Sequence, residues 1–231
     1  MGASDRPFRA AIFDLDGTLA DTLATIAGIA NFALCELGLP QHPLAAFNDF
    51  VGDGIRLLAQ RVLPAERLAR EPELHERLLS VMRTRYATHV LDGARLYDGI
   101  AEMLAELSQR GAALGVLSNK PDALTIATVE GLGIAGRFRA IRGQRDGCPP
   151  KPDPTAALAV ARELGSTPDE VLYVGDTATD METARRAGFA AVGVLWGFRQ
   201  RAELERSGAR WIIAHPRELA ALFDGGSGAG R

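Results

Sequence analysis

Short apolar runs without helical spacing recur along this chain and predict buried strands. The clearest runs lie at residues 10–15 (AAIFDL), 113–117 (ALGVL) and 171–174 (VLYV), and two weaker ones lie at residues 139–142 and 190–195. Continuous apolar runs of this length are typical of parallel strands that are covered on both faces. We therefore expect these segments to form one sheet.

Helical patterns fill the intervals between these runs. One helix is predicted from apolar residues that recur at i, i+3, i+4 and i+7, namely Ile100, Met103, Leu104 and Leu107. Two more are predicted in the segments KPDPTAALAVARELG (151–165) and ATDMETARRAG (178–188), each of which ends at a glycine. Strands that alternate with helices predict an α/β fold with a Rossmann-like parallel sheet.

The interval from residue 20 to about residue 92 interrupts this alternation. It contains no convincing strand, only helical patterns such as LATIAGIANFALCELG (23–38) and ELHERLLSVMRTRYATHV (73–90). An interval this long exceeds a simple crossover between parallel strands. We therefore expect an α-helical cap domain at residues 20–92, inserted into a core made of residues 1–19 and 93–224. The last segment, residues 225–231 (GGSGAGR), is predicted to be a flexible tail.

Composition and charge narrow the class of protein. Of the 231 residues, 47% are apolar and 24% are charged, and the mean hydropathy is near zero, as in an ordinary soluble globular protein. The net charge of −3, without a basic block, argues against a nucleic-acid binder. No apolar stretch approaches the length of a membrane span, and the first residues, MGASDRPF, lack the hydrophobic core of a secretion signal. We therefore expect a cytoplasmic protein in which Cys35 and Cys148 are lone thiols, because neither has a CxxC partner.

Four short polar segments stand where predicted strands end or in the loops beyond them. They are DLDGT (14–18), SNK (118–120), KPDP (151–154) and GDTATD (175–180). In open parallel sheets, ligands bind at the carboxyl ends of the strands. We therefore expect these segments to meet at one edge of the sheet and to form a single site.

Carboxylates dominate this predicted site. Asp14, Asp16 and Asp176 would be crowded together, which is unfavourable unless a cation lies between them. Oxygen ligands with room for water suit Mg²⁺, which is often bound beside phosphate. With Mg²⁺ present, one carboxylate can attack phosphorus, because the cation offsets the repulsion between two anions.

The remaining polar groups of the predicted site suit a phosphoryl group. Ser118, Asn119 and Lys151 supply hydrogen-bond donors and a positive charge for the phosphoryl oxygens. Gly17 and Thr18 can present backbone N–H groups to the same phosphate. The sequence therefore predicts an enzyme that acts on a small-molecule phosphate ester.

In this order, the four segments resemble the haloacid dehalogenase-like superfamily. In that family a DxDGT segment supplies the nucleophile and the acid/base, and a Ser or Thr, a Lys and a late GDxxxD segment complete the site. By resemblance, Asp14 forms an aspartyl-phosphate, while Asp16 protonates the leaving alkoxide and later activates water. The resemblance also implies that Asp14, the backbone carbonyl of Asp16 and Asp176 hold Mg²⁺. Asp180 would support the metal or its waters, or would simply favour a helix N-terminus.

The place of the insertion refines this resemblance. A helical cap after the first strand is typical of the C1-cap subgroup, and FDLDGTLADT, VGDGIRLL, LSNKP, VGDTATDMETARRAG and GVLWGF are most similar to phosphoglycolate phosphatases. By this resemblance VGDGIR (51–56) is the cap loop that faces the site, and Arg56 binds a substrate carboxylate. The plain alternative is that Arg56 is a solvated helix residue.

Several functions fit the same scaffold. The first is a Mg²⁺-dependent phosphomonoesterase, as a monomer or homodimer, that acts on phosphoglycolate or a similar small anionic ester. The alternatives are a phosphosugar phosphatase, a phosphomutase that returns the phosphoryl group to a sugar, and a pyrophosphatase. A non-catalytic binding protein is disfavoured because the motif residues, Asp14 and Lys151 among them, are all present. A dehalogenase is disfavoured because it would not need Asp16 or the metal carboxylates.

Overall fold

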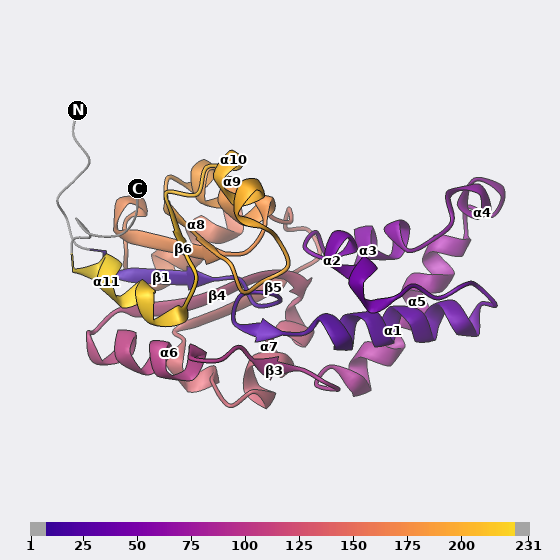
Figure 1. Ribbon diagram of the computed structural model, residues 1–231, viewed down its shortest axis with the longest axis horizontal. Helices are drawn as coiled ribbons and strands as arrows, with labels where there is room; N and C mark the ends of the chain where they lie inside the picture. The colour runs from indigo at the N-terminus through magenta and orange to yellow at the C-terminus, as the bar shows by residue number, and fades with distance from the viewer. Residues whose placement is uncertain (1–7, 225–231) are drawn as a thin grey trace.

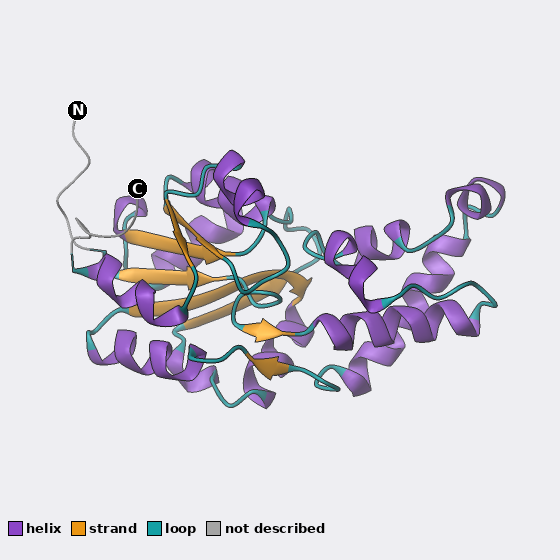
Figure 2. Ribbon diagram, viewed as in Figure 1, coloured by secondary structure: helices purple, strands orange, loops and turns teal. Residues whose placement is uncertain are grey.

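The computed structural model describes residues 8–224 and has an α/β core with a helical extension (Figures 1 and 2). Six parallel strands form the central sheet in the order β5-β4-β1-β6-β7-β8. Their bounds are β1 Ala10–Phe13, β4 Ala113–Pro121, β5 Ala140–Gln144, β6 Val171–Gly175, β7 Ala190–Val194 and β8 Trp211–Ile213. The predicted α/β class with a Rossmann-like parallel sheet is confirmed.

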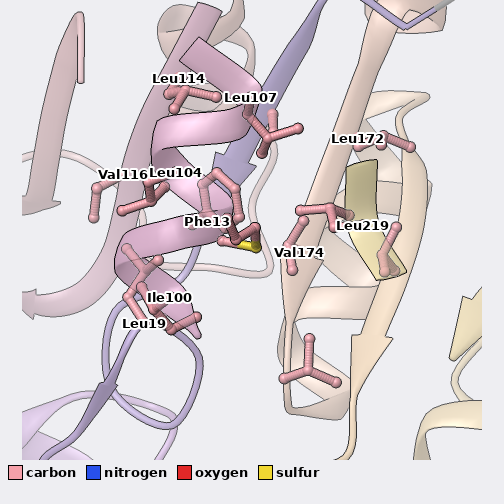
Figure 3. Packing of buried hydrophobic residues seen from close by; sticks show 14 of the residues in the cluster. Phe13, Leu19, Ile100, Leu104, Leu107, Leu114, Val116, Leu172, Val174 and Leu219 are labelled. Atoms are coloured by element: carbon pink, nitrogen blue, oxygen red, sulfur yellow. The ribbon is translucent and has the colours of Figure 1, made fainter. Parts of the chain in front are cut away.

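Each strand of the sheet centre alternates its side chains between two hydrophobic layers. Ala11 and Phe13 face the layer that is covered by α6 (Ile100–Gln109) and α11 (Leu219–Phe223). Figure 3 shows this packing around Phe13. Ala10 and Ile12 face the opposite layer, which is covered by α8 (Thr155–Glu163), α9 (Ala178–Ala187) and α10 (Arg201–Arg206). Burial on both faces explains why the strands are continuous apolar runs in the sequence.

The predicted strands are all present, with shifted ends. The run at residues 10–15 gives a strand of only four residues, because Asp14 already belongs to the loop of the site. The run at 113–117 continues to Pro121 and carries SNK within the strand. Strand β8, of three residues, lies at the sheet edge and was not predicted, since so short a strand has no readable period.

The segment between the first two sheet strands is helical and has a hydrophobic core of its own. It contains α1 (Leu23–Glu36), α2 (Phe47–Phe50), α3 (Ile55–Arg61), α4 (Ala65–Arg70) and α5 (Leu74–His89). Its buried cluster, from Ile26 to Tyr86, shares no residue with the two clusters on the sheet. Figure 1 shows these helices gathered at one end of the molecule, away from α6 and α11. Within residues 8–224, no helix is both long enough and apolar enough to cross a membrane.

A small antiparallel pair joins the two chain connections between core and helical segment. Strand β2 (Ala20–Asp21) pairs with β3 (Arg95–Leu96), and an ion pair of 2.8 Å joins Asp21 to Arg95. The expectation that residues 20–92 hold no strand was wrong, because two residues are too few to show an alternating pattern. The domain boundaries at 19/20 and 92/93 stay predictions, and the predicted tail at 225–231 lies outside the described residues.

The helical segment offers a matched test of its core. Leu78 is fully buried in its cluster, whereas 42% of Leu57 is exposed. We expect Leu78→Ala to lower the free energy of unfolding by about 2–5 kcal/mol, because it leaves a cavity. Leu57→Ala should change it by less than about 0.5 kcal/mol. Urea unfolding followed by circular dichroism measures both, and equal losses would show that the segment has no tightly packed core.

Candidate active site

The site lies at the carboxyl ends of the strands, where the helical segment covers the sheet. Asp14 directly follows β1, Asp176 directly follows β6, and Ser118 and Asn119 stand near the end of β4. Lys151 comes from the segment between β5 and α8. Core and helical segment together enclose a narrow cavity of about 40 Å³ that Asp14, Asp16, Ser118 and Asn119 help to line.

Asp14 presents its two carboxylate oxygens to different surroundings. Oδ1 accepts a hydrogen bond of 2.7 Å from the Leu15 N–H and lies 3.1 Å from Nζ of Lys151. No group of the described residues donates to Oδ2. Because every fully buried side-chain N or O of residues 8–224 has a partner, Oδ2 keeps some accessible surface, and Asp14 is one of the residues that line the cavity.

Lys151 is held between two buried carboxylates. Its Nζ donates to Oδ1 of Asp180 at 2.7 Å and also faces Asp14. Burial alone would lower the pKa of Lys151, but Asp14 and Asp180 outweigh it and raise that pKa well above its ordinary value. The side chain is therefore a permanent cation.

Asp180 caps helix α9 and orients Lys151 at the same time. Its Oδ2 accepts from the N–H and the hydroxyl of Thr177, at 3.1 Å and 2.7 Å, in a capping box. Its Oδ1 accepts from Lys151. The helix-terminus role expected as an alternative for Asp180 is thus present in the structure.

Asp176 is fixed by donors on both sides of its carboxylate. The Thr18 hydroxyl donates to Oδ1 at 3.0 Å, and the Phe198 N–H donates to Oδ2 at 2.8 Å. Gly17 passes so close that a Cβ there would lie 2.4 Å from Oδ2, and its φ of +86° is one that side chains disfavour. The glycine of DLDGT is therefore needed to admit Asp176.

Three carboxylates converge at the base of the site. Oxygens of Asp14, Asp176 and Asp180 lie within 4.8 Å of one another, and all three residues are buried. Burial, opposed by Lys151 and reinforced by Asp180, raises the pKa of Asp14 to about 7. Burial together with Asp180 and Asp14 raises the pKa of Asp176 well above its ordinary value. This concentration of oxygen ligands and unfavourable negative charge could bind a metal ion.

Asn119 holds the backbone of Lys151 in place. Its Oδ1 accepts from the Lys151 N–H at 2.8 Å, and its Nδ2 donates to the Lys151 carbonyl at 3.2 Å. Nδ2 also lies 3.4 Å from the carbonyl of Gly52 in the helical segment. The side chain was expected to donate to phosphate, and its contacts are instead with the backbone on both sides of the cavity.

The loop of DLDGT uses two of its N–H groups internally. The N–H of Gly17 donates to the Ala20 carbonyl and that of Thr18 to the Leu15 carbonyl. The N–H groups of Gly17 and Thr18 were expected to be presented to phosphate, and both are instead bonded within the loop. The N–H of Asp16 has no acceptor among the residues that the structure describes.

Arg56 is not brought to the cavity. Its guanidinium pairs with Glu76 on the surface of the helical segment, and 59% of its side chain is exposed. It lines a separate, open groove with Leu57 and Arg83. The position of Arg56 gives no support to the expected contact with a substrate carboxylate.

Lys120 is a buried cation of the site that sequence analysis missed. Its Nζ donates to both oxygens of Asp16, at 3.0 and 3.3 Å, and only 3% of the side chain is exposed. The Thr22 hydroxyl donates to the same carboxylate at 2.7 Å. Burial would lower the pKa of Lys120, but Asp16, Tyr86 and Asp14 together outweigh it, so that the pKa is raised. Lys120 belongs to the SNK segment with Ser118, and this position could have indicated that Lys120 lies in the site.

The end of α2 and the turn that follows it, residues 48–53, are fastened over the site by core side chains. Arg199, which follows β7, donates to the carbonyls of Asn48 and Val51. The Thr179 hydroxyl donates to Asp53 at 2.6 Å. With the contact between Asn119 and Gly52, these bonds hold residues 48–53 closed over the cavity.

Comparison with known proteins places this geometry in a family. The model of the haloacid dehalogenase-like hydrolases matches residues 11–194, from β1 to the end of β7. The chain belongs to this family. The match spans the residues that form the site, and the recognition made from the DLDGT, SNK, KPDP and GDTATD segments is confirmed.

Relatives of this hydrolase are named as phosphatases. It is 34% identical over 190 residues to the phosphoglycolate phosphatase of Mesorhizobium japonicum, which covers 82% of this chain and 84% of the relative. It is 33% identical over 220 residues to the N-acetylmuramic acid 6-phosphate phosphatase of Pseudomonas aeruginosa, and the alignment covers 94% of this chain and 95% of the relative.

Solved structures agree with these relatives. A Lactobacillus delbrueckii protein assigned as a phosphoglycolate phosphatase superposes with a TM-score of 0.86 at 29% identity, over 94% of this chain and 98% of the other. A haloacid dehalogenase-like protein from Streptococcus pneumoniae gives a TM-score of 0.83 at 26% identity, with the same coverage. This member of the family is therefore an enzyme, a phosphatase similar to the phosphoglycolate phosphatases.

Proposed function

We propose that this enzyme hydrolyses phosphoglycolate, or a similarly small anionic phosphate monoester, through an aspartyl-phosphate on Asp14 with Mg²⁺ as cofactor. The observation that carries the proposal is the asymmetry of the Asp14 carboxylate. One oxygen is tied to Leu15 and Lys151, while the other has no donor among the described residues in a side chain that lines the cavity. A nucleophile needs this combination of a fixed direction and a free lone pair.

In the first step Oδ2 of Asp14 attacks phosphorus, and the bond between phosphorus and the ester oxygen breaks. Asp16 gives a proton to the departing oxygen, so that an alcohol leaves. Lys151 neutralises charge on the phosphoryl oxygens, since it is a buried cation beside Asp14. Ser118 and the free N–H of Asp16 supply donors to the same oxygens.

In the second step water attacks the phosphorus of the aspartyl-phosphate. Asp16, now a carboxylate, accepts the proton of the water, and the bond from phosphorus to Oδ2 of Asp14 breaks. Phosphate leaves, and the Asp14 carboxylate is restored. The contacts of Asp16 to Lys120 and Thr22 hold its carboxylate at the mouth of the cavity between these two proton transfers.

The acidic group at the base of the site fits Mg²⁺. Asp14 and Asp176, with the backbone carbonyl of Asp16, would hold the ion, and Asp180 would support it by orienting its surroundings. Two of these carboxyls have raised pKa values because negative charge is crowded and buried there, and a divalent cation offsets that cost. When bound, Mg²⁺ lowers the repulsion between Asp14 and the phosphate.

The narrow cavity favours a small leaving group. At about 40 Å³, with residues 48–53 closed over it, it leaves little room beyond the phosphate. The two relatives are named for esters of an acid, which supports an anionic leaving group. The muramic acid relative makes a phosphosugar the second candidate.

The cysteines favour a cytoplasmic location for the enzyme. Cys35 and Cys148 are both free thiols, and free thiols persist in the reducing cytoplasm. The enzyme binds a small-molecule phosphate ester and is proposed to act as a monomer or homodimer.

Replacement of Asp14 tests the nucleophile. We expect Asp14→Asn to lower kcat by at least ~10³-fold, because an amide is a poor nucleophile and a weaker metal ligand. Initial rates on phosphoglycolate, with circular dichroism to verify the fold, measure this. Activity within tenfold of the unchanged enzyme would remove Asp14 from the mechanism.

Metal exchange tests the cofactor. EDTA should abolish turnover and Mg²⁺ should restore it, whereas Ca²⁺ should restore it poorly. Ca²⁺ accepts longer bonds and more ligands, which would let it take both oxygens of Asp14 and remove the attacking lone pair. Full activity in metal-free buffer would contradict a metal site among Asp14, Asp176 and Asp180.

Substrate preference tests the small leaving group. We expect kcat/KM to be higher for phosphoglycolate than for glucose 6-phosphate or a nucleoside monophosphate, because these do not fit the closed cavity. N-acetylmuramic acid 6-phosphate belongs in the same panel. If a sugar phosphate proves the best substrate, the chemistry on Asp14 stands and the proposed substrate does not.

A further inference from the structure

The cavity wall that faces Asp14 is built largely by the helical segment and is mostly apolar. It is lined by Ile26 of α1, Val51 of the closing loop, and Ile55 and Leu58 of α3. A wall of this kind fits the carbon atoms of a leaving group but offers nothing to a charge. The other lining residues include Lys120 of β4 and Tyr86 of α5, which bring an ammonium and a phenol to the cavity.

Lys120 is the single cation among the described residues that line this cavity, which also holds Asp14 and Asp16. An ammonium carries three N–H donors, and Asp16 is the only hydrogen-bond partner of Nζ within residues 8–224. A bidentate carboxylate engages at most two of these donors. At least one donor therefore has no hydrogen-bond acceptor among the described residues, and it is shielded from bulk water.

Tyr86 supplies the second polar group. Only 4% of the residue is exposed, and no hydrogen bond reaches its hydroxyl from the part of the chain that the structure describes. Since no fully buried side-chain oxygen there lacks a partner, this hydroxyl keeps some accessible surface, and Tyr86 is one of the residues that line the cavity. Nζ of Lys120 lies 5.2 Å from the centre of the Tyr86 ring, so the two groups are neighbours on the wall.

We propose that Lys120 and Tyr86 form the subsite for a carboxylate on the leaving group of the substrate. The proposal rests on the proposed function and gives it a specificity determinant. An ammonium and a phenol hydroxyl both donate to carboxylate oxygens. A monoanion suits the place better than a second phosphate, because the ammonium is shared with Asp16 and the cavity is narrow.

The subsite differs from the one that sequence resemblance suggested. Arg56 has its guanidinium on the surface beside Glu76, so its charge is screened by water. Lys120 is buried in the same cavity as the nucleophile, and a charge there acts through a medium of low polarity. The shielded cation is therefore the one that can distinguish an anionic leaving group from a neutral one.

The test compares phosphoglycolate with ethyl phosphate, which has a methyl group in place of the carboxylate. The quantity measured is the ratio of their kcat/KM values, in which any effect of Lys120 on Asp16 cancels. We expect Lys120→Met to lower this ratio roughly 10- to 100-fold, the range for a charged hydrogen bond. Tyr86→Phe should lower it roughly 2- to 10-fold, as for a neutral one. Lys120→Arg should retain part of the preference.

Arg83→Met is the matched control, since Arg83 is an exposed cation on the same helix, α5, as Tyr86. Its ratio should equal that of the unchanged enzyme. An unchanged ratio in both Lys120→Met and Tyr86→Phe would overturn the subsite while leaving the phosphatase in place. If Lys120→Met does not fold, an unchanged ratio in Tyr86→Phe alone overturns the two-residue subsite. If the enzyme without substitutions hydrolyses neither ester, the proposed function is refuted, and the subsite with it.

Discussion

The site depends on one buried cation that is shared by two buried carboxylates. Lys151 lies 3.1 Å from Asp14 and 2.7 Å from Asp180, and removal of the Lys151 charge would leave both carboxylates without this cation in a medium that stabilises them poorly. The same contacts fix where each group points, since Asp180 is anchored at the start of α9 and Asp14 at the end of β1. Charge balance and geometry are thus set by the same few bonds.

Around these three charged residues, several side chains form hydrogen bonds with the backbone and so hold the site in shape. Asn119 joins strand β4 to Lys151 and to Gly52, so it links three parts of the chain that are distant in sequence. Arg199 and Thr179 hold the covering loop from the side of β7 and α9. The covering segment is therefore held by hydrogen bonds to its carbonyls and to one carboxylate, while Leu124 and Phe198 of the core pack against the hydrophobic cluster of the helical segment.

The features that could be predicted from the sequence are the apolar runs of the strands and the polar segments of the site. Burial on both faces gave the strands a readable apolar pattern, and the four polar segments gave the place of Asp14, Lys151 and Asp176. Sequence analysis missed β2 and β8, which are too short to have a period. It also could not tell where long side chains point. Arg56 was expected in the site and lies on the surface, while Lys120 was passed over and is buried in it, because rotamers depend on neighbours that come from elsewhere in the chain.

The short β2–β3 pair has a mechanical consequence. Both connections to the helical segment pass through it, with Ala20 opposite Leu96 and Asp21 opposite Arg95. Two linkers that are bonded side by side bend together as a ribbon, whereas two separate linkers would allow sliding and twisting. The helical segment is thus attached to the core along one paired ribbon, which limits the directions in which residues 48–53 can shift relative to the carboxyl ends of the strands.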